Sequence, residues 1–292
     1  PVDIKEPDRY ELWGGYRPVR LAIGPRNMAG QAHRIAQAVT SNLGIESVSF
    51  ALDNGNFRFP VDHRVPKAAW NDPGWQTHQI HLLSSTFTHV LTESGTGMYG
   101  ALNGGFVDEQ LQQMKTDRLE VGVLLHGSEI RDPRRHRHLP FSPYASDDPL
   151  IKDLEQATSR LRRHLEGLDI PFFVTTPDLR EDVDATWVPV VIDPEPWRAL
   201  SPAFENDLPV VLHLPTNGRL KGSDHIDEVL FALSDEGLIE YLRPTESMQP
   251  DEVAAVIERA DIVIDGIVLG AYGVMSCQTM AAGRLAVANI RD

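Results

Sequence analysis

The feature that most constrains this chain is a regular alternation between short apolar runs and segments with helical periodicity. Runs of consecutive apolar residues are typical of strands buried on both faces, whereas apolar residues three and four positions apart indicate amphipathic helices. Strands that alternate with helices are joined by right-handed crossovers and form parallel sheets. The chain is therefore expected to be an α/β protein.

The N-terminal part carries the first series of this alternation. A glycine loop and a helix are expected after the first apolar run, and an unbroken apolar stripe from Leu150 to Leu168 predicts a helix over residues 149–167. Strands are predicted at residues 19–24, 47–52, 88–91, 121–125, 172–175 and 187–192.

A second series follows a proline-rich segment. Residues 193–209 contain four prolines and keep neither periodicity, which predicts a linker. Beyond it, strands are predicted at 210–214, 239–242, 262–264 and 285–290, with helices at 226–233, from Pro250 onward and at 274–282. We expect a Rossmann-like N-terminal domain (residues 1–195), a linker (196–209) and a Rossmann-like C-terminal domain (210–292), each with its ligand at the carboxyl ends of its strands.

Composition restricts the functions that fit this fold. A net charge of −15 argues against a general nucleic-acid-binding protein, because neutralising phosphates requires an excess of Lys and Arg. The single cysteine, Cys277, excludes an internal disulfide framework and suits the cytoplasm. The sequence contains no apolar run long enough to span a bilayer.

The loop from His213 to Gly222 follows the first strand of the C-terminal domain and precedes a helix. Arg219 and Lys221 lie where a diphosphate would contact backbone amides and a helix N-terminus. Lys and Arg are also common in ordinary polar loops, so that alternative stays open.

Four ordered segments carry a resemblance to a known family: residues 213–222, 260–265, 270–273 and 280–283. Together they resemble the C-terminal domain of the GT-B glycosyltransferases of family 4. The resemblance implies two Rossmann-like domains that face a cleft, no metal, no cofactor, a nucleotide-diphosphate sugar as donor and transfer with retention of configuration. It also implies that Arg219 and Lys221 hold the diphosphate, and that this domain is C-terminally short here.

The chain departs from the family where two glutamates would flank the glycine loop. Gly270 stands at the first position and Gln278 at the second. Gln278 can still hydrogen-bond but brings no charge, and Gly270 has no side chain. The resemblance implies that the glycine loop with Gly270 and Gly273 lies beside the donor sugar and phosphate, and that Gln278 stands where the donor ribose is bound. The alternatives are a simple tight turn for the two glycines and an exposed helix face for Gln278.

In the N-terminal domain, Gly30 belongs to the glycine loop after the first strand, where the resemblance implies an acceptor-side loop; a plain capping turn is the alternative. His126 follows the strand at 121–125 and is the candidate for the reaction centre, because ligand-contacting side chains emerge at strand carboxyl ends. Glu129 and Arg131 either orient an acceptor or pair with each other.

Residues 131–138 contain four arginines and two histidines. This basic segment is interpreted either as a solvated mobile loop or as a contact with an anionic acceptor or the inner face of the membrane. Asp182 and Asp184 resemble a metal-binding pair, but their position does not suit one.

The leading hypothesis is a cytoplasmic glycosyltransferase that moves a sugar from a nucleotide-diphosphate sugar to an acceptor. The sequence does not identify the acceptor, and both lipid-linked and polysaccharide acceptors stay open. The alternative, favoured by Gly270 and Gln278, is a non-catalytic nucleotide-sugar-binding or partner subunit. A sugar-nucleotide epimerase of the same shape is a third possibility, but its distinctive residues are not present.

Overall fold

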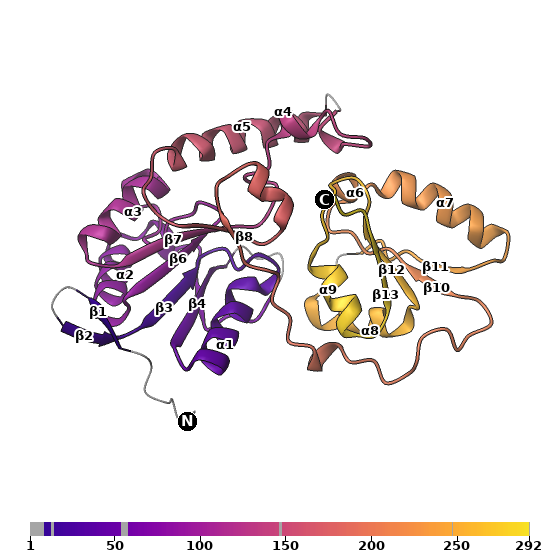
Figure 1. Ribbon diagram of the computed structural model, residues 1–292, viewed down its shortest axis with the longest axis horizontal. Coiled ribbons are helices and arrows are strands. Elements are labelled where there is room, and N and C mark those ends of the chain that lie inside the picture. The colour runs from indigo at the N-terminus through magenta and orange to yellow at the C-terminus, as the bar shows by residue number, and fades with distance from the viewer. Residues whose placement is uncertain (1–8, 13–14, 54–57, 146–147, 247, 292) are drawn as a thin grey trace. The chain divides into compact units, whose positions relative to one another are not determined.

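The computed structural model describes residues 9–12, 15–53, 58–145, 148–246 and 248–291. It contains two parallel sheets, each flanked by helices (Figure 1). The predicted α/β class with two Rossmann-like parallel sheets is confirmed.

The larger sheet has seven parallel strands. Their spatial order is β5 (His63–Val65), β4 (Glu46–Leu52), β3 (Arg20–Gly24), β6 (His89–Glu93), β7 (Glu120–Leu125), β8 (Phe172–Val174) and β9 (Thr186–Trp187). From β3 the chain first extends the sheet in one direction and then returns to extend it in the other. The order therefore reverses between β3 and β6, and such a switch point is where open α/β sheets bind ligands.

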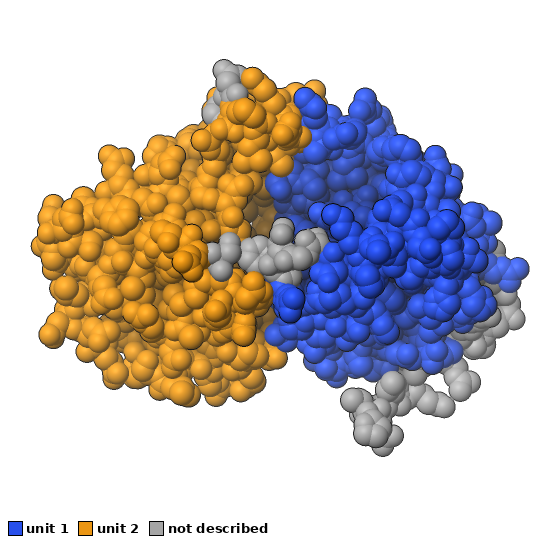
Figure 2. Space-filling model, turned by 180° about the vertical axis from the view of Figure 1, so that it is seen from behind, with its two compact units in different colours: residues 1–130, 156–175, 179–191 blue, residues 131–155, 176–178, 192–292 orange. Residues whose placement is uncertain are grey.

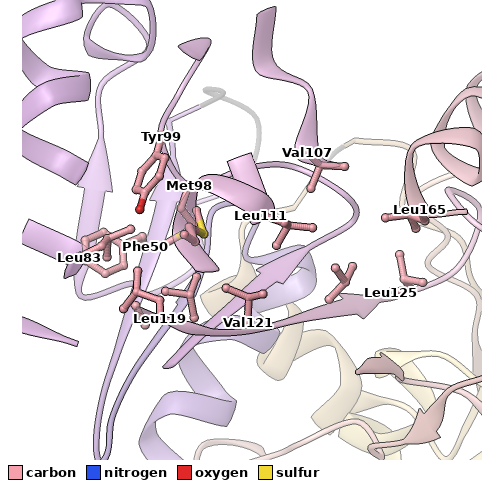
Figure 3. Close-up of a cluster of buried hydrophobic side chains, with 14 of the residues drawn as sticks. Phe50, Leu83, Met98, Tyr99, Val107, Leu111, Leu119, Val121, Leu125 and Leu165 are labelled. Carbon is pink, nitrogen blue, oxygen red and sulfur yellow. The ribbon is translucent and has the colours of Figure 1, made fainter. Parts of the chain in front are cut away.

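Helices cover both faces of this sheet. Ala22 and Val123 belong to a core that α2 (Pro73–Thr86), α3 (Val107–Thr116) and α5 (Pro149–Leu165) close, and Figure 3 shows part of it. The adjacent residues Ile23 and Leu124 pack with α1 (Gln31–Leu43) in a separate cluster. Neighbouring residues on a strand point to opposite faces, so each strand contributes to both cores.

The smaller sheet has four parallel strands, in the order β11 (Glu240–Leu242), β10 (Val210–Leu212), β12 (Ile262–Gly266) and β13 (Leu285–Ala288). Leu212 packs with α8 (Pro250–Arg259) and α9 (Val274–Ala281), whereas Val211 packs with α7 (Ser223–Asp235). Here the switch point lies between β10 and β12.

Short elements complete the fold. They are an antiparallel hairpin of β1 (Arg9–Leu12) and β2 (Gly15–Pro18), the single-turn helices α4 (Pro133–His136) and α6 (Gly218–Lys221), and 3-10 helices at Met28–Gly30, Ala69–Asn71, Leu102–Gly105, Pro143–Ala145, Pro177–Glu181 and Glu195–Trp197. None of the helices within the described ranges is both long and apolar enough to cross a membrane.

The strand predictions are confirmed in position, but three of the predicted strands are too long by two residues or more. The strands expected at 210–214 and 285–290 end two residues earlier, at Leu212 and Ala288. The strand expected at 187–192 is only β9, which ends at Trp187. Pro189 explains the early end, because proline has no N–H to donate to a neighbouring strand.

The chain divides into two compact units, shown in different colours in Figure 2. Unit 1 consists of residues 1–130, 156–175 and 179–191, and unit 2 of residues 131–155, 176–178 and 192–292. Unit 2 thus includes the predicted C-terminal domain, the proline-rich segment and the basic segment. Within the proline-rich segment, Trp197 packs against the α8–α9 core.

Candidate functional site

Glu93, the last residue of β6, organises the carboxyl edge of the larger sheet. Its side chain is fully buried, and its Oε2 accepts hydrogen bonds from the backbone N–H groups of Asn27 at 2.6 Å and Arg26 at 3.2 Å. These amides belong to the loop after β3, directly across the switch point from β6. Glu93 therefore fixes this loop against the neighbouring strand end.

His126 lies directly after β7 and contacts the other oxygen of Glu93. The distance from His126 Nε2 to Glu93 Oε1 is 2.9 Å, and the imidazole is 9% exposed. Burial alone would lower the pKa of His126, but the hydrogen bond to Glu93 and the charges of Glu93 and Glu129 outweigh it and raise this pKa. The structure thus gives His126 a buried acidic partner at a strand carboxyl end.

Glu129 supports the same edge through the backbone. One oxygen accepts from the N–H of His126 at 2.6 Å and from the Ser94 hydroxyl at 3.0 Å, and the other accepts from the N–H of Gly127 at 2.9 Å. The hydrogen bonds of Glu129 therefore stabilise the turn that contains His126.

Arg131 does not pair with Glu129, so that alternative is wrong. Its Nη2 donates to Asp178 Oδ2 at 2.6 Å and its Nε to the same oxygen at 3.2 Å, and both side chains are buried. A buried guanidinium requires a nearby carboxylate, and Glu129 already serves three other donors. Arg131 belongs to unit 2 and Glu129 to unit 1.

Gly30 occupies the capping position of α1 with a φ of +77°. Its N–H donates to the carbonyl of Asn27 at 3.0 Å, so the turn itself uses this amide. A Cβ at this position would lie 3.2 Å from the ring of Phe59. These contacts fit the tight capping turn; an acceptor contact at Gly30 stays a prediction.

In unit 2, the switch point of the smaller sheet holds Lys221 and Asp265. Lys221 ends α6 in the loop after β10, and its Nζ lies 2.5 Å from Oδ1 of Asp265 in β12. Oδ2 of Asp265 accepts from the N–H of Gly273 at 2.6 Å and from the Ser276 hydroxyl at 2.7 Å. Burial raises the pKa of Asp265, but Lys221, Ser276 and Gly273 together lower it below its ordinary value.

Two glycines make room for this ion pair. A Cβ at Gly273 would lie 2.8 Å from Asp265 Oδ2 and 2.9 Å from Lys221 Nζ, and one at Gly266 would lie 2.8 Å from Lys221 Cδ. The absence of a side chain thus leaves room for the ammonium group at Gly273 and for the Lys221 Cδ at Gly266. Gly273, a predicted site residue, thus lies beside Lys221, and Asp265 forms hydrogen bonds with both residues.

The second cation of the loop has a different partner. Arg219 forms an ion pair with Asp148, and its side chain is half-exposed. Arg219 and Lys221 therefore contact different carboxylates, although both belong to the single turn α6.

The two departures from the family pattern also have structural explanations. A Cβ at Gly270 would lie 2.4 Å from Arg291 Nε, and the N–H of Arg291 donates to the Gly270 carbonyl at 3.0 Å. Arg291 thus occupies the space that a larger side chain would need. Gln278 lies half-buried on α9, and among the described residues its side chain forms no hydrogen bond.

The basic segment at 131–138 contains the single-turn helix α4 and several buried side chains, so it is not a wholly solvated loop. His136 is fully buried, with Nδ1 2.7 Å from the Ser142 hydroxyl and Nε2 3.0 Å from the Leu269 carbonyl. Arg131 pairs with Asp178, and Arg137 pairs with Glu155. Much of the positive charge is therefore neutralised within unit 2; a contact with the membrane or an anionic acceptor stays a prediction.

Sequence reasoning did not identify Glu93 and Asp265, the two buried carboxylates at the switch points. A signal was available, because each residue closely follows a run predicted as a strand: Asp265 comes directly after 262–264, and Glu93 two residues after 88–91. Asp182, half of the rejected metal pair, forms an ion pair with Arg162 at 3.2 Å. Within the described ranges, no three His, Cys, Asp or Glu side chains are grouped so that they could hold a metal ion.

Comparisons with known proteins leave the family open. No family model matches the chain, and no curated protein does. Solved structures do match, among them the crystal structure of a protein described as a UDP-N-acetylglucosamine 2-epimerase from Listeria monocytogenes. That match covers 93% of this chain and 79% of the other at 10% identity, with a TM-score of 0.45. A likeness of this degree does not assign an activity.

Proposed function

We propose that the protein is a glycosyltransferase that binds a nucleotide-diphosphate sugar at the carboxyl edge of its smaller sheet. The observation that carries the proposal is the arrangement of Lys221 between two glycines at the β10–β12 switch point. A switch point at the strand carboxyl ends is where such sheets bind ligands, and a lysine is a common phosphate-binding residue. The ordered sequence resemblance over residues 213–283 supports the same donor.

Lys221 has donors left for such a ligand. An ammonium group has three N–H donors, and Asp265 accepts one of them. The side chain is 23% exposed, so the other donors can reach a phosphate oxygen. A cation held rigidly by a buried carboxylate stabilises the charge that develops on a leaving diphosphate without having to reorganise. Transfer with retention of configuration rests on the sequence resemblance alone.

A second candidate function is a nucleotide-sugar-binding or partner subunit without transferase activity. The observation that favours it is Arg291 in the space beside Gly270, where the resemblance implies a glutamate. Together with Gln278, this leaves no carboxylate side chain at either family position.

Titration with UDP-, GDP- and ADP-sugars by calorimetry distinguishes the two functions, with release of nucleoside diphosphate as the measure of turnover. Binding with turnover is the result expected of the transferase. Binding without turnover, in the presence of sugar and alkyl-glycoside acceptors, favours the second function. No binding of any of these donors or of free UDP, GDP or ADP contradicts both.

The Lys221→Met variant tests the site itself. Loss of a charge-assisted hydrogen bond costs about 1.5–3 kcal/mol, so donor binding should weaken by roughly ten- to a hundredfold. Lys152→Met, at an exposed position of α5, is the matched control and should bind as the wild type does. Because Lys221→Met leaves Asp265 buried without its cation, Lys221→Met combined with Asp265→Asn is measured in parallel. Wild-type affinity in a folded Lys221 variant would remove this residue from the proposal.

A further inference from the structure

His213 is a buried histidine that connects two segments of unit 2. It follows β10 directly, it is fully buried, and its backbone N–H donates to the carbonyl of Leu242 at 3.1 Å. Nδ1 of its ring lies 2.7 Å from the carbonyl oxygen of Ile264 in β12. Nε2 lies 2.8 Å from the hydroxyl of Ser223, the first residue of α7. One imidazole therefore joins β12 to the start of α7.

The surroundings of the ring determine where its proton lies. A carbonyl oxygen can only accept hydrogen bonds, so Nδ1 carries a proton. Burial lowers the pKa of His213, and the charges of Arg243, after β11, and Lys221, in α6, lower it further. The hydrogen bond to Ile264 and the charge of Asp227 in α7 act in the opposite direction but do not outweigh them. The ring is therefore neutral at pH 7, with Nε2 as a hydrogen-bond acceptor.

The two segments that His213 joins also carry the ion pair of the proposed donor site. Ile264 precedes Asp265 in β12, and Ser223 lies two residues after Lys221. The imidazole thus contacts the immediate neighbourhood of both partners, on the strand side and on the helix side. Its two hydrogen bonds therefore help to set where Lys221 lies relative to Asp265.

The chain between Lys221 and Ser223 has little freedom of its own. Gly222 is the single residue between them, and it turns the chain with a φ of +78°. The N–H of Ile267, just after β12, donates to the carbonyl of Lys221 at 3.1 Å. Gly218 leaves room for the Ser223 hydroxyl, because a Cβ there would lie 2.8 Å from its oxygen. Lys221 is thus held to β12 and its following loop both by its own carbonyl and through Ser223.

We propose that His213 is a positioning residue of the donor site: its neutral imidazole, with the proton on Nδ1, holds the start of α7 against β12 and so places the ammonium group of Lys221 for a phosphate oxygen of the donor. This inference rests on the proposed donor site, and every residue that it uses belongs to unit 2. A lysine side chain is long and flexible, so its charge acts at a fixed point only when its surroundings hold it there.

Two substitutions of His213 remove its side-chain hydrogen bonds one at a time. The amide nitrogen of asparagine reaches about the place of Nδ1, so His213→Asn keeps a donor for Ile264 and loses the bond to Ser223. The amide of glutamine reaches about the place of Nε2, so His213→Gln keeps an acceptor for Ser223 and loses the bond to Ile264. Each variant therefore breaks the connection between β12 and α7.

Nitrogen-15 NMR tests the positioning without a donor. In the wild type at pH 7, the ring of His213, assigned through the backbone, should be neutral with its proton on Nδ1. The ammonium signal of Lys221, assigned with Lys221→Met, should shift or broaden in both His213 variants. Gly237→Ala, which strains unit 2 where nothing lies within 4 Å of the added carbon, is the control and should leave that signal unchanged.

Two NMR results would overturn the inference. One is an unchanged Lys221 signal in folded His213→Asn and His213→Gln. The other is a wild-type ring that is charged at pH 7 or carries its proton on Nε2 alone, and this result decides the matter even if neither variant folds.

Calorimetry then measures the effect on the donor, with whichever of the UDP-, GDP- and ADP-sugars binds the wild type most tightly. A misplaced ammonium group loses part of a charge-assisted hydrogen bond, so the Kd should rise roughly three- to tenfold in each His213 variant. Gly237→Ala should bind as the wild type does at a temperature where both are folded. A general loss of stability in unit 2 would instead affect Gly237→Ala and the His213 variants alike.

The outcomes of the binding experiment separate the two proposals. If the wild type binds a donor and both folded His213 variants bind it equally well, the positioning role is wrong and the donor site stands. If the wild type binds no donor, the donor site and the role of His213 in it fall together. The Lys221 signal still shows in that case whether His213 positions this side chain.

Discussion

At the residue scale, the two sheets use a buried carboxylate in the same topological place. Glu93 ends β6 and Asp265 lies near the end of β12, and each strand borders the switch point of its sheet. Each carboxylate holds the loop that follows the neighbouring strand, Glu93 through backbone amides and Asp265 through Lys221. A buried charge is tolerated only when it is paired, so each carboxylate both requires and fixes its loop.

Replacing Asp265 should therefore reduce stability and change its dependence on pH. Asp265→Asn removes the partner of Lys221 and should lower the free energy of unfolding at pH 7 by about 1.5–3 kcal/mol, because Lys221 can still reach water. The pKa of Asp265 is lowered on folding, so its contribution is fully present above the unfolded value, about 4, and is lost as pH falls through the folded value. Urea unfolding at pH 7, 4 and 3 measures this.

The control for Asp265→Asn is Asp207→Asn, at an exposed position in the proline-rich segment. The control should unfold as the wild type does at each pH. The difference in the free energy of unfolding between Asp265→Asn and the wild type should become smaller toward pH 3. A difference that stays constant with pH would contradict the ion-pair explanation.

The candidate site could be predicted from sequence only as far as its loops. Strand ends and glycine loops are local features, so His126, Lys221 and Gly273 were placed at carboxyl edges correctly. The partners of these side chains depend on strand order, which periodicity does not reveal. Nothing local to the sequence predicts that Arg219 contacts Asp148 rather than the partner of Lys221.

At the element scale, periodicity predicted long elements well and short ones poorly. The helix predicted over residues 149–167 corresponds to α5, which ends at Leu165, because apolar residues at three- and four-residue intervals line one face of a helix. The hairpin of β1 and β2 was not predicted, since its two short strands carry no apolar alternation. The single turn α6 was also missed, because residues 213–222 were predicted as a loop. Gly222, with a φ of +78°, makes the break between α6 and α7.

Gly222→Ala tests the importance of that break. An alanine in the left-handed region costs about 1–2 kcal/mol, and its Cβ would lie only 2.6 Å from Val268 Cγ1, which adds roughly another 1–3 kcal/mol of overpacking. Gly237→Ala is the matched control, because φ is +71° there and nothing lies within 4 Å of the added carbon. Gly222→Ala should therefore be the less stable variant and, by displacing Lys221, should also weaken donor binding. Equal losses of stability in the two variants would show that the Val268 side chain moves to accommodate the added methyl group.

At the scale of the whole molecule, the chain passes between its two compact units more than once. Residues 131–155 belong to unit 2 although they lie between β7 and β8 of unit 1, and α5 begins in one unit and ends in the other. No change of periodicity marks these crossings, so only the proline-rich segment was expected as a boundary. Each unit nevertheless has its own hydrophobic clusters on both faces of its sheet.

Separate cores predict two unfolding transitions in calorimetry, and two glycine variants can assign them. Gly167→Ala in unit 1 and Gly237→Ala in unit 2 introduce the same strain, with φ of +74° and +71° and no neighbour within 4 Å of the added carbon. Each variant should lower the transition of its own unit and leave the other unchanged. A nucleotide-diphosphate sugar at a hundredfold excess over its Kd should stabilise by about 2.7 kcal/mol only the transition that Gly237→Ala lowers. A donor that raised the Gly167 transition instead would place the binding site on the larger sheet, and a single transition moved by both variants would show that the units unfold together.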